Sequence, residues 1–129
     1  MHIDGTWINQ HGSILELECD ASGGLTGQYC SRKGRAASGK RYPLTGRLNG
    51  EVLSFLVDWC DADDNLHAIT SFSGRIGRDR NGREVIHTVW VLARQWEDAE
   101  QTRATGTWNA FLTNSDVFYR PEGGGPVPV

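Results

Sequence analysis

The fold is decided by the stretch Gly5-Thr6-Trp7-Ile8-Asn9-Gln10-His11-Gly12-Ser13, which has the pattern of a strand, a tight polar turn and the start of a second strand. Side chains alternate along a strand with period two, so Trp7 and Asn9 share one face of the first strand. Ser13 opens the second strand, so the Asn9 amide and the Ser13 hydroxyl flank the same turn. These two groups could receive a polar ligand atom at the mouth of a barrel, or could satisfy their own backbone in an ordinary hairpin.

The rest of the sequence continues this pattern as eight strand-like segments bounded by turn residues. The segments span residues 4–9, 13–19, 24–31, 41–48, 52–60, 68–77, 83–94 and 110–120. Turn sequences such as Asn49-Gly50 favour hairpins between consecutive strands. No long amphipathic helix is predicted, only a short turn near Glu97–Gln101. We therefore expect an all-β fold, an eight-stranded antiparallel up-and-down β-barrel, over residues 1–120 and a flexible Gly/Pro tail over 121–129.

Composition and charge argue against several classes of protein. The chain has 129 residues and a net charge of −3 with both signs interspersed. This length fits one domain with a substantial core, and the lack of a basic surface argues against nucleic acid as a partner. No apolar run is long enough to cross a membrane, and no signal peptide is recognisable. Three cysteines, an odd number without metal-ligand spacing, argue against a Zn²⁺ site.

Alternation gives each strand an inner face, and the polar and aromatic residues on these faces cluster at one end. They lie late in one strand and early in the next, which in an up-and-down meander is the same end of the barrel. These residues are Asn9, Ser13, Tyr29, Ser31, Trp59, Thr70, Phe72 and Trp90. The opposite end should be closed by the apolar residues Leu15, Leu17, Leu25, Phe55, Ile76 and Ile86. Eight strands enclose room for about one small ligand, so we expect a pocket at the polar end.

In order and spacing, these residues resemble the avidin/streptavidin family over residues 5–120. The matching motifs are Gly5-Thr6-Trp7…Asn9…Gly12-Ser13, Leu25-Thr26-Gly27…Tyr29, Tyr42…Leu44-Thr45-Gly46, Val57…Trp59, Thr70…Phe72…Gly74, Asp79-Arg80-Asn81-Gly82…Thr88…Trp90…Leu92 and Trp108…Asp116…Phe118. The resemblance implies a non-enzymatic protein that binds biotin tightly, needs no cofactor and is secreted or periplasmic. Met1 stands directly before a strand-like segment, so we expect any export signal to have been removed.

The resemblance also implies which groups bind the ureido ring of biotin. Asn9, Ser13 and Tyr29 match the three donors around the ureido oxygen. Asp116 and Ser31 match the acceptors for the two ureido N–H groups. A residue such as Asp116 could instead be a core carboxylate held by local donors, although a lone buried Asp is uncommon.

The other site residues implied by the resemblance surround the ring sulfur and the valeryl chain. Thr70 matches the hydroxyl beside the sulfur, and Leu92 belongs to the apolar wall. The aromatic box consists of Trp59, Phe72, Trp90 and, from a neighbouring subunit, Trp108. Residues 32–40, with Lys33 and Gly34, occupy the place of the pocket lid. Large aromatic residues are also ordinary filler in a small barrel, and both descriptions can hold together.

One departure from the family pattern concerns the biotin carboxylate. Ala68 stands where the family usually has a serine that reaches this group. A cation of the basic loop, such as Lys33 or Lys40, could replace the serine by charge. The loop could equally be a solvated surface.

Two other functions compete with biotin binding. A lipocalin-like barrel that binds another small apolar ligand has the same fold class, because fold alone does not determine function. An enzyme is disfavoured because His2, His11, His67 and His87 are the only histidines, and none forms a recognisable nucleophile–base pair.

The cysteines are expected to stay unpaired within the barrel. Cys19 lies in phase with Leu15 and Leu17, which predicts a buried free thiol at the closed end. Cys30 and Cys60 lie out of phase with their inward neighbours and point outward on strands separated by a third. Two ladder spacings put them about 10 Å apart, beyond the roughly 7 Å Cα separation that a disulfide spans.

Trp108 leads to an expectation about assembly. It precedes Asp116 by eight residues, the spacing at which the family's lid tryptophan precedes its ureido acceptor. The resemblance places it over the biotin of an adjacent subunit and favours a homotetramer; alternatively, it packs on the rim of its own barrel. Outward Val89, Thr113 and Ser115 match the central interface of such a tetramer but are less apolar than in avidin, which suggests an assembly that ligand tightens.

Overall fold

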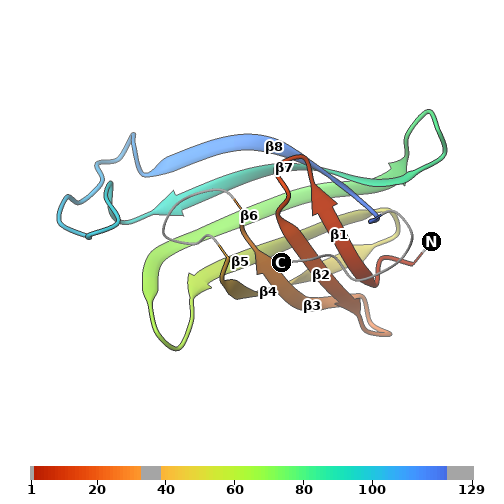
Figure 1. Ribbon diagram of the computed structural model, residues 1–129, viewed down its shortest axis with the longest axis horizontal. Helices are drawn as coiled ribbons and strands as arrows, with labels where there is room; N and C mark the ends of the chain where they lie inside the picture. Colours follow the sequence, from red (N-terminus) through yellow and green to blue (C-terminus); the bar gives the residue numbers. More distant parts are fainter. Residues whose placement is uncertain (1, 33–38, 122–129) are drawn as a thin grey trace.

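The computed structural model describes residues 2–32 and 39–121, and over these residues eight antiparallel strands close into one barrel (Figure 1). The strands are β1 (Gly5–Asn9), β2 (Ile14–Cys19), β3 (Gly24–Cys30), β4 (Arg41–Asn49), β5 (Val52–Cys60), β6 (Asn65–Arg78), β7 (Glu84–Arg94) and β8 (Phe111–Tyr119). Each strand pairs with its neighbours in sequence, and β1 closes the barrel against β8 through Ile8↔Tyr119 and Asn9↔Phe118. The predicted all-β, up-and-down barrel is confirmed.

The main difference from the predicted boundaries is at the start of β6. This strand begins at Asn65, three residues before the predicted start at 68, whereas the other strands begin and end within one residue of expectation. Cys60 pairs with Asn65 across a register irregularity in β5, and His67 adopts a positive φ of 51°. The polar sequence before Ala68 therefore resembles a loop although the backbone already belongs to the ladder.

One end of the barrel is closed by apolar side chains, as predicted. Leu15, Leu17, Leu25, Phe55, Ile76 and Ile86 are all buried in one hydrophobic cluster. Trp7 is fully buried at this end, and its indole Nε1–H donates to the carbonyl of Ile3 at 2.9 Å. The guanidinium of Arg120 lies 4.0 Å from the centroid of the Trp7 ring, a distance at which the cation is attracted to the ring face.

Two glycines allow strands to approach closely beside this core. A Cβ at Gly27 would collide with the carbonyl oxygen of Glu16 on β2. A Cβ at Gly46 would collide with the carbonyl oxygen of Ser54 on β5. Glycine is therefore required at these two positions, where β3 lies close to β2 and β4 lies close to β5.

The cysteines depart in part from expectation. All three are free thiols, but Cys19 is half-buried rather than buried, because it is the last residue of β2 and lies beside the turn at Asp20. Cys30 faces away from the inward Tyr29 and is nevertheless fully buried. Its register partner Ile14 is also buried, so the outer face is covered at this point.

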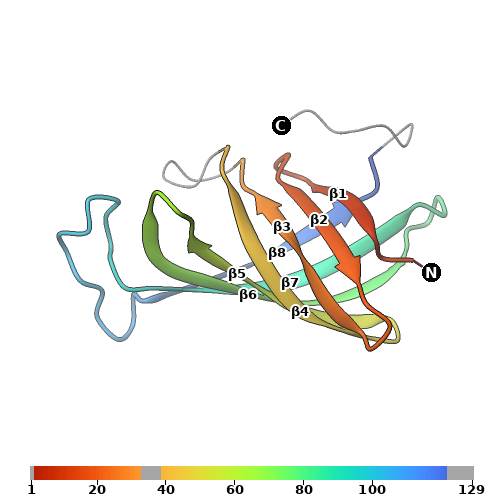
Figure 2. The same cartoon turned by 90° about the horizontal axis from the view of Figure 1, so that it is seen from below.

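The segment between β7 and β8 projects beyond the open end of the barrel, away from the β6–β7 hairpin (Figure 2). It is internally bonded: Trp96 and Ala104 form an isolated bridge, and the Glu97 N–H donates to the carbonyl of Arg103 at 2.8 Å. No helix among the described residues has the length and hydrophobicity that a membrane span requires.

Candidate ligand-binding pocket

The open end of the barrel contains a cavity of about 500 Å³, a volume typical of small-molecule sites. Ten of the predicted site residues line it, namely Asn9, Ser13, Tyr29, Ser31, Trp59, Thr70, Phe72, Trp90, Leu92 and Asp116. They lie on β1, β3, β5, β6, β7 and β8 or, for Ser13 and Ser31, directly beside β2 and β3. They share one end of the barrel because consecutive strands run in opposite directions. Within the two described ranges, no group of His, Cys, Asp and Glu side chains is placed to hold a metal ion.

Asn9 has a fixed orientation at the inner end of the cavity. Its Oδ1 accepts from the backbone N–H groups of Ser13 at 2.9 Å and His11 at 3.0 Å. Its Nδ2 is therefore turned toward the cavity, where it lies 3.3 Å from Oδ2 of Asp116 and 3.5 Å from the Tyr29 hydroxyl. Asn9 therefore does bond to the backbone of its own turn, which was one of the two alternatives raised from the sequence, and these bonds also orient its amide donor.

Ser13 and Tyr29 lie beside this amide. The Ser13 Oγ accepts from the backbone N–H of Arg32 at 2.9 Å, which leaves its own proton to donate elsewhere. The Tyr29 hydroxyl bonds with the side chains of Ser13 and Asn9. Burial, followed by the negative charge of Asp116, raises the pKa of Tyr29, while these two hydrogen bonds act in the opposite direction. Tyr29 is therefore a neutral phenol, able to donate, throughout the physiological range.

Asp116 is the buried carboxylate of the cavity, with 7% of its surface exposed. Gln10 Nε2 donates to its Oδ1 at 3.1 Å, while the Gln10 Oε1 accepts from the backbone N–H of Val117 at 3.0 Å. The Thr88 hydroxyl also donates to the Asp116 carbonyl at 2.9 Å. Sequence reasoning missed Gln10, because its role depends on the closure of β1 against β8 rather than on any local pattern.

Aromatic side chains form the wall of the cavity. Trp59 Nε1 donates to Thr70 Oγ1 at 2.8 Å, so the Thr70 hydroxyl proton is available for another acceptor. The Tyr29 and Trp59 rings meet edge to face at 5.6 Å between centroids, and Phe72 stacks on Phe55 at 4.6 Å. These contacts hold the rings in place whether or not a ligand is present.

The outer rim comes from residues that sequence reasoning did not assign to the site. Arg94 and the segment after β7 contribute Trp96, Glu97, Asp98, Ala99 and Gln101. The segment is tied to β6 because Gln101 Oε1 lies 2.8 Å from Nδ1 of His67 and Gln101 Nε2 donates to the Asn65 carbonyl at 2.7 Å. The residues after β7 follow no strand periodicity, so the sequence does not predict them. Only Arg94, which alternates with Trp90 and Leu92 on the inner face of β7, could have been predicted to line the pocket.

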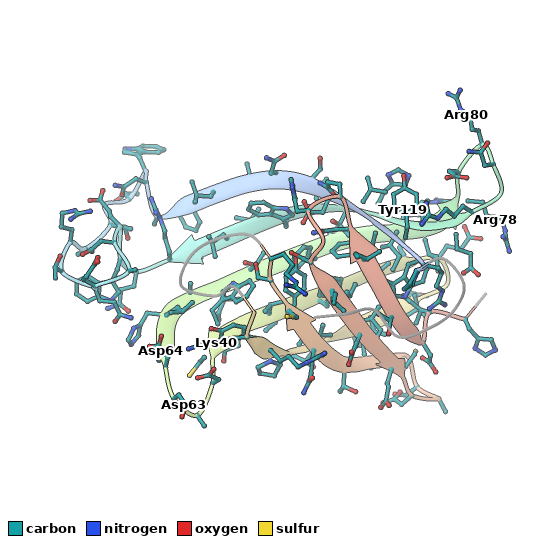
Figure 3. The ribbon with its side chains drawn as sticks, in the orientation of Figure 1. Lys40, Asp63, Asp64, Arg78, Arg80 and Tyr119 are labelled. Carbon is teal, nitrogen blue, oxygen red and sulfur yellow. The ribbon has the colours of Figure 1, made fainter. Side chains whose placement is uncertain are left out.

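The remaining predicted residues lie elsewhere. Trp108 does not line the cavity of its own chain, and 94% of its surface is exposed, so the alternative that it packs on its own rim is wrong. Lys33 and Gly34 lie outside the described residues. Lys40 lies 3.9 Å from Asp64 near the β5–β6 turn (Figure 3).

This barrel is similar in sequence to known proteins. The family model described as the Avidin family matches residues 1–121. Afifavidin from Afifella pfennigii is 34% identical over 95 residues, covering 72% of this chain, and the chain spans 58% of the length of afifavidin. Avidin from Gallus gallus is 27% identical over 126 residues, covering 92% of this chain and 77% of avidin.

Solved structures agree with these relatives. The rhizavidin–biotin complex has a TM-score of 0.76 and 31% identity, with coverage of 89% of this chain and 96% of that chain. Apo shwanavidin has a TM-score of 0.76 and 29% identity, with coverage of 91% and 98%. Together with the family model over residues 1–121, these similarities show that the chain belongs to the avidin family.

Proposed function

We propose that this protein binds biotin non-covalently and tightly, one molecule per barrel, without a cofactor. The observation that carries the proposal is the convergence of the Asn9, Ser13 and Tyr29 donors with the Asp116 carboxylate at the inner end of an otherwise apolar cavity. The avidin family consists of non-enzymatic binding proteins, which confirms the prediction that the chain is not an enzyme.

The donors suit a ureido carbonyl. Three donors on one oxygen draw electron density toward it, and each hydrogen bond strengthens in a cavity from which water is excluded. Asp116 then accepts from one ureido N–H, and Ser31, which is buried and lines the cavity, accepts from the other. The ring and the aliphatic chain would lie against Trp59 and the other aromatic walls, where each Å² of apolar surface removed from water contributes roughly 25 cal/mol.

The relatives support biotin as the ligand. The solved structures that resemble this chain include rhizavidin and a shwanavidin variant in complex with biotin. No observation favours the lipocalin-like alternative. A purely apolar ligand would offer the side chains of Asn9 and Asp116 no hydrogen bond beyond those they make within the protein.

For assembly, we propose a homotetramer in which Trp108 covers the pocket of a neighbouring subunit. A tryptophan with 94% of its surface exposed is an unfavourable apolar surface for a monomer. Exposed apolar side chains also lie on the outer face of β6 to β8, including Ile69, Val89, Val91 and Phe111. We also propose that the protein is secreted or periplasmic, as the resemblance implies.

Tryptophan fluorescence tests the proposed ligand, because Trp59, Trp90 and Trp96 line the cavity. Biotin should change the emission and saturate at one molecule per chain, while retinol and a long-chain fatty acid should leave it unchanged. Saturation by the fatty acid but not by biotin would contradict the proposal and favour the lipocalin-like function. Light scattering with and without biotin tests the assembly, and a monomer under both conditions would contradict it.

A further inference from the structure

Arg94 is placed at the outer end of the cavity by the alternation of β7. It lies in phase with Trp90 and Leu92 on the inner face, and it is half-buried and lines the cavity. Its register partner on β6 is Ala68, which offers no polar side chain. The pocket therefore has uncharged donors at its inner end and aromatic walls. At its outer end, the charged side chain of Arg94 lies next to the methyl group of Ala68.

The Arg94 guanidinium is anchored by a backbone carbonyl and not by a carboxylate. Nε and Nη2 donate to the carbonyl of Asn109 at 3.2 and 3.1 Å. A guanidinium is always protonated and carries five N–H donors. Three of these donors remain beyond the two bonds to Asn109. Among residues 2–32 and 39–121, no carboxylate lies within ion-pair distance of Arg94.

The acidic residues of the rim already have other partners. Glu97 lies 3.6 Å from Arg103 and accepts from the Asn109 side chain. Asp98 lies 3.9 Å from Arg103 and accepts from the Thr102 hydroxyl at 2.5 Å. These bonds, led by the one from Thr102, lower the pKa of Asp98 to about 2. Both carboxylates therefore pair with Arg103, and the guanidinium of Arg94 has no ion-pair partner among the described residues.

We propose that Arg94 binds the carboxylate at the end of the ligand's aliphatic chain and makes this pocket prefer the acid over its neutral amide. The proposal rests on the proposed biotin function, because biotin carries an uncharged ureido head, an apolar chain and a terminal carboxylate. A planar guanidinium fork matches a carboxylate in geometry and charge. Arg94 would thus supply the contact for which Ala68 has no hydroxyl.

Arg94 could also act through structure alone, by holding the Asn109 carbonyl next to Trp108. Affinities for biotin and for biotinamide, which has the same skeleton without the charge, separate the two roles. The variants are Arg94→Gln, which removes the charge, and Arg94→Lys, which keeps it but loses the fork. Arg80→Gln is the matched control, since Arg80 is exposed on the β6–β7 hairpin at the other end of the molecule (Figure 3).

In Arg94→Gln, the ratio of the biotinamide Kd to the biotin Kd should fall roughly tenfold, as loss of a charged hydrogen bond implies. Arg94→Lys should retain part of the preference, and Arg80→Gln should leave the ratio unchanged. Added salt should reduce the ratio in the parent protein but not in Arg94→Gln, because salt screens a charge pair that is accessible to solvent. Equal weakening of both ligands in Arg94→Gln, or a ratio within about twofold of the parent, would overturn the proposal.

The experiment separates this proposal from the proposed function. If the parent protein binds neither ligand, biotin binding itself is wrong. If it binds both and the ratio is insensitive to Arg94→Gln, only the assignment of Arg94 is wrong. If Arg94→Gln does not fold, Arg94→Lys and the salt dependence of the parent protein decide, and a salt-independent preference would overturn the assignment.

Discussion

Removal of the Asp116 carboxylate should weaken biotin binding more than any other change of one acceptor in the pocket. Asp116 is 7% exposed and receives bonds from Gln10 at 3.1 Å and Asn9 at 3.3 Å. In Asp116→Ala, a ureido N–H of the bound ligand would lose a charged acceptor, and no described side chain offers another carboxylate at the inner end of the cavity.

The magnitude follows from these contacts. A hydrogen bond to a charged group contributes about 1.5–3 kcal/mol, and a buried N–H left unpaired costs about 1 kcal/mol or more. The sum is about 2.5–4 kcal/mol, or roughly 60- to 700-fold in Kd. Asp116→Asn keeps the volume and a neutral acceptor, so its loss should be smaller, roughly tenfold.

Dissociation rates of labelled biotin measure these differences when binding is too tight for direct titration. Asp63→Ala is a matched control, because Asp63 is exposed at the β5–β6 turn (Figure 3), and it should bind as the parent does. Thermal unfolding without ligand checks that each variant is folded. A Kd for Asp116→Ala within about twofold of the parent would refute the assignment of Asp116 as the ureido acceptor.

Three further predictions concern assembly, pH and packing. Trp108→Ala should weaken biotin and raise the fraction of dimers in light scattering; if neither changes, the shared pocket is wrong. Burial and Asp116 raise the pKa of Tyr29 above its ordinary value of 10.0, so its contribution to stability is complete below about pH 10 and is lost as pH rises from there toward the folded-state pKa. The melting temperature of the parent should therefore fall more steeply above pH 10 than that of Tyr29→Phe, and equal slopes would contradict this. Gly46→Ala should destabilise the barrel by about 1–3 kcal/mol because its Cβ meets the backbone of β5, whereas Gly77→Ala, with open space around the added Cβ, should be nearly neutral in urea unfolding.

Alternation along strands was enough to predict the barrel and most of its inner residues. Trp59, Thr70 and Phe72 line the cavity because period-two geometry leaves a strand with only two faces. The start of β6 was missed because His67 lies in the ladder with a positive φ, which its residue type does not signal.

The parts that local patterns missed depend on contacts between distant segments. Gln10 reaches Asp116 only because β1 meets β8, and the rim is held by the contact of Gln101 with His67. The outward phase of Cys30 did not reveal its burial, because cover on the outer face is a property of the folded chain.

Calorimetric titration of the protein with biotin tests the central claim most directly, because it reports both whether this ligand binds and how many sites each chain provides. The account predicts one biotin per chain, with heat released as the ureido group meets Asn9, Ser13, Tyr29 and Asp116. No heat of binding at micromolar protein, or saturation well below one biotin per chain for folded protein, would contradict it.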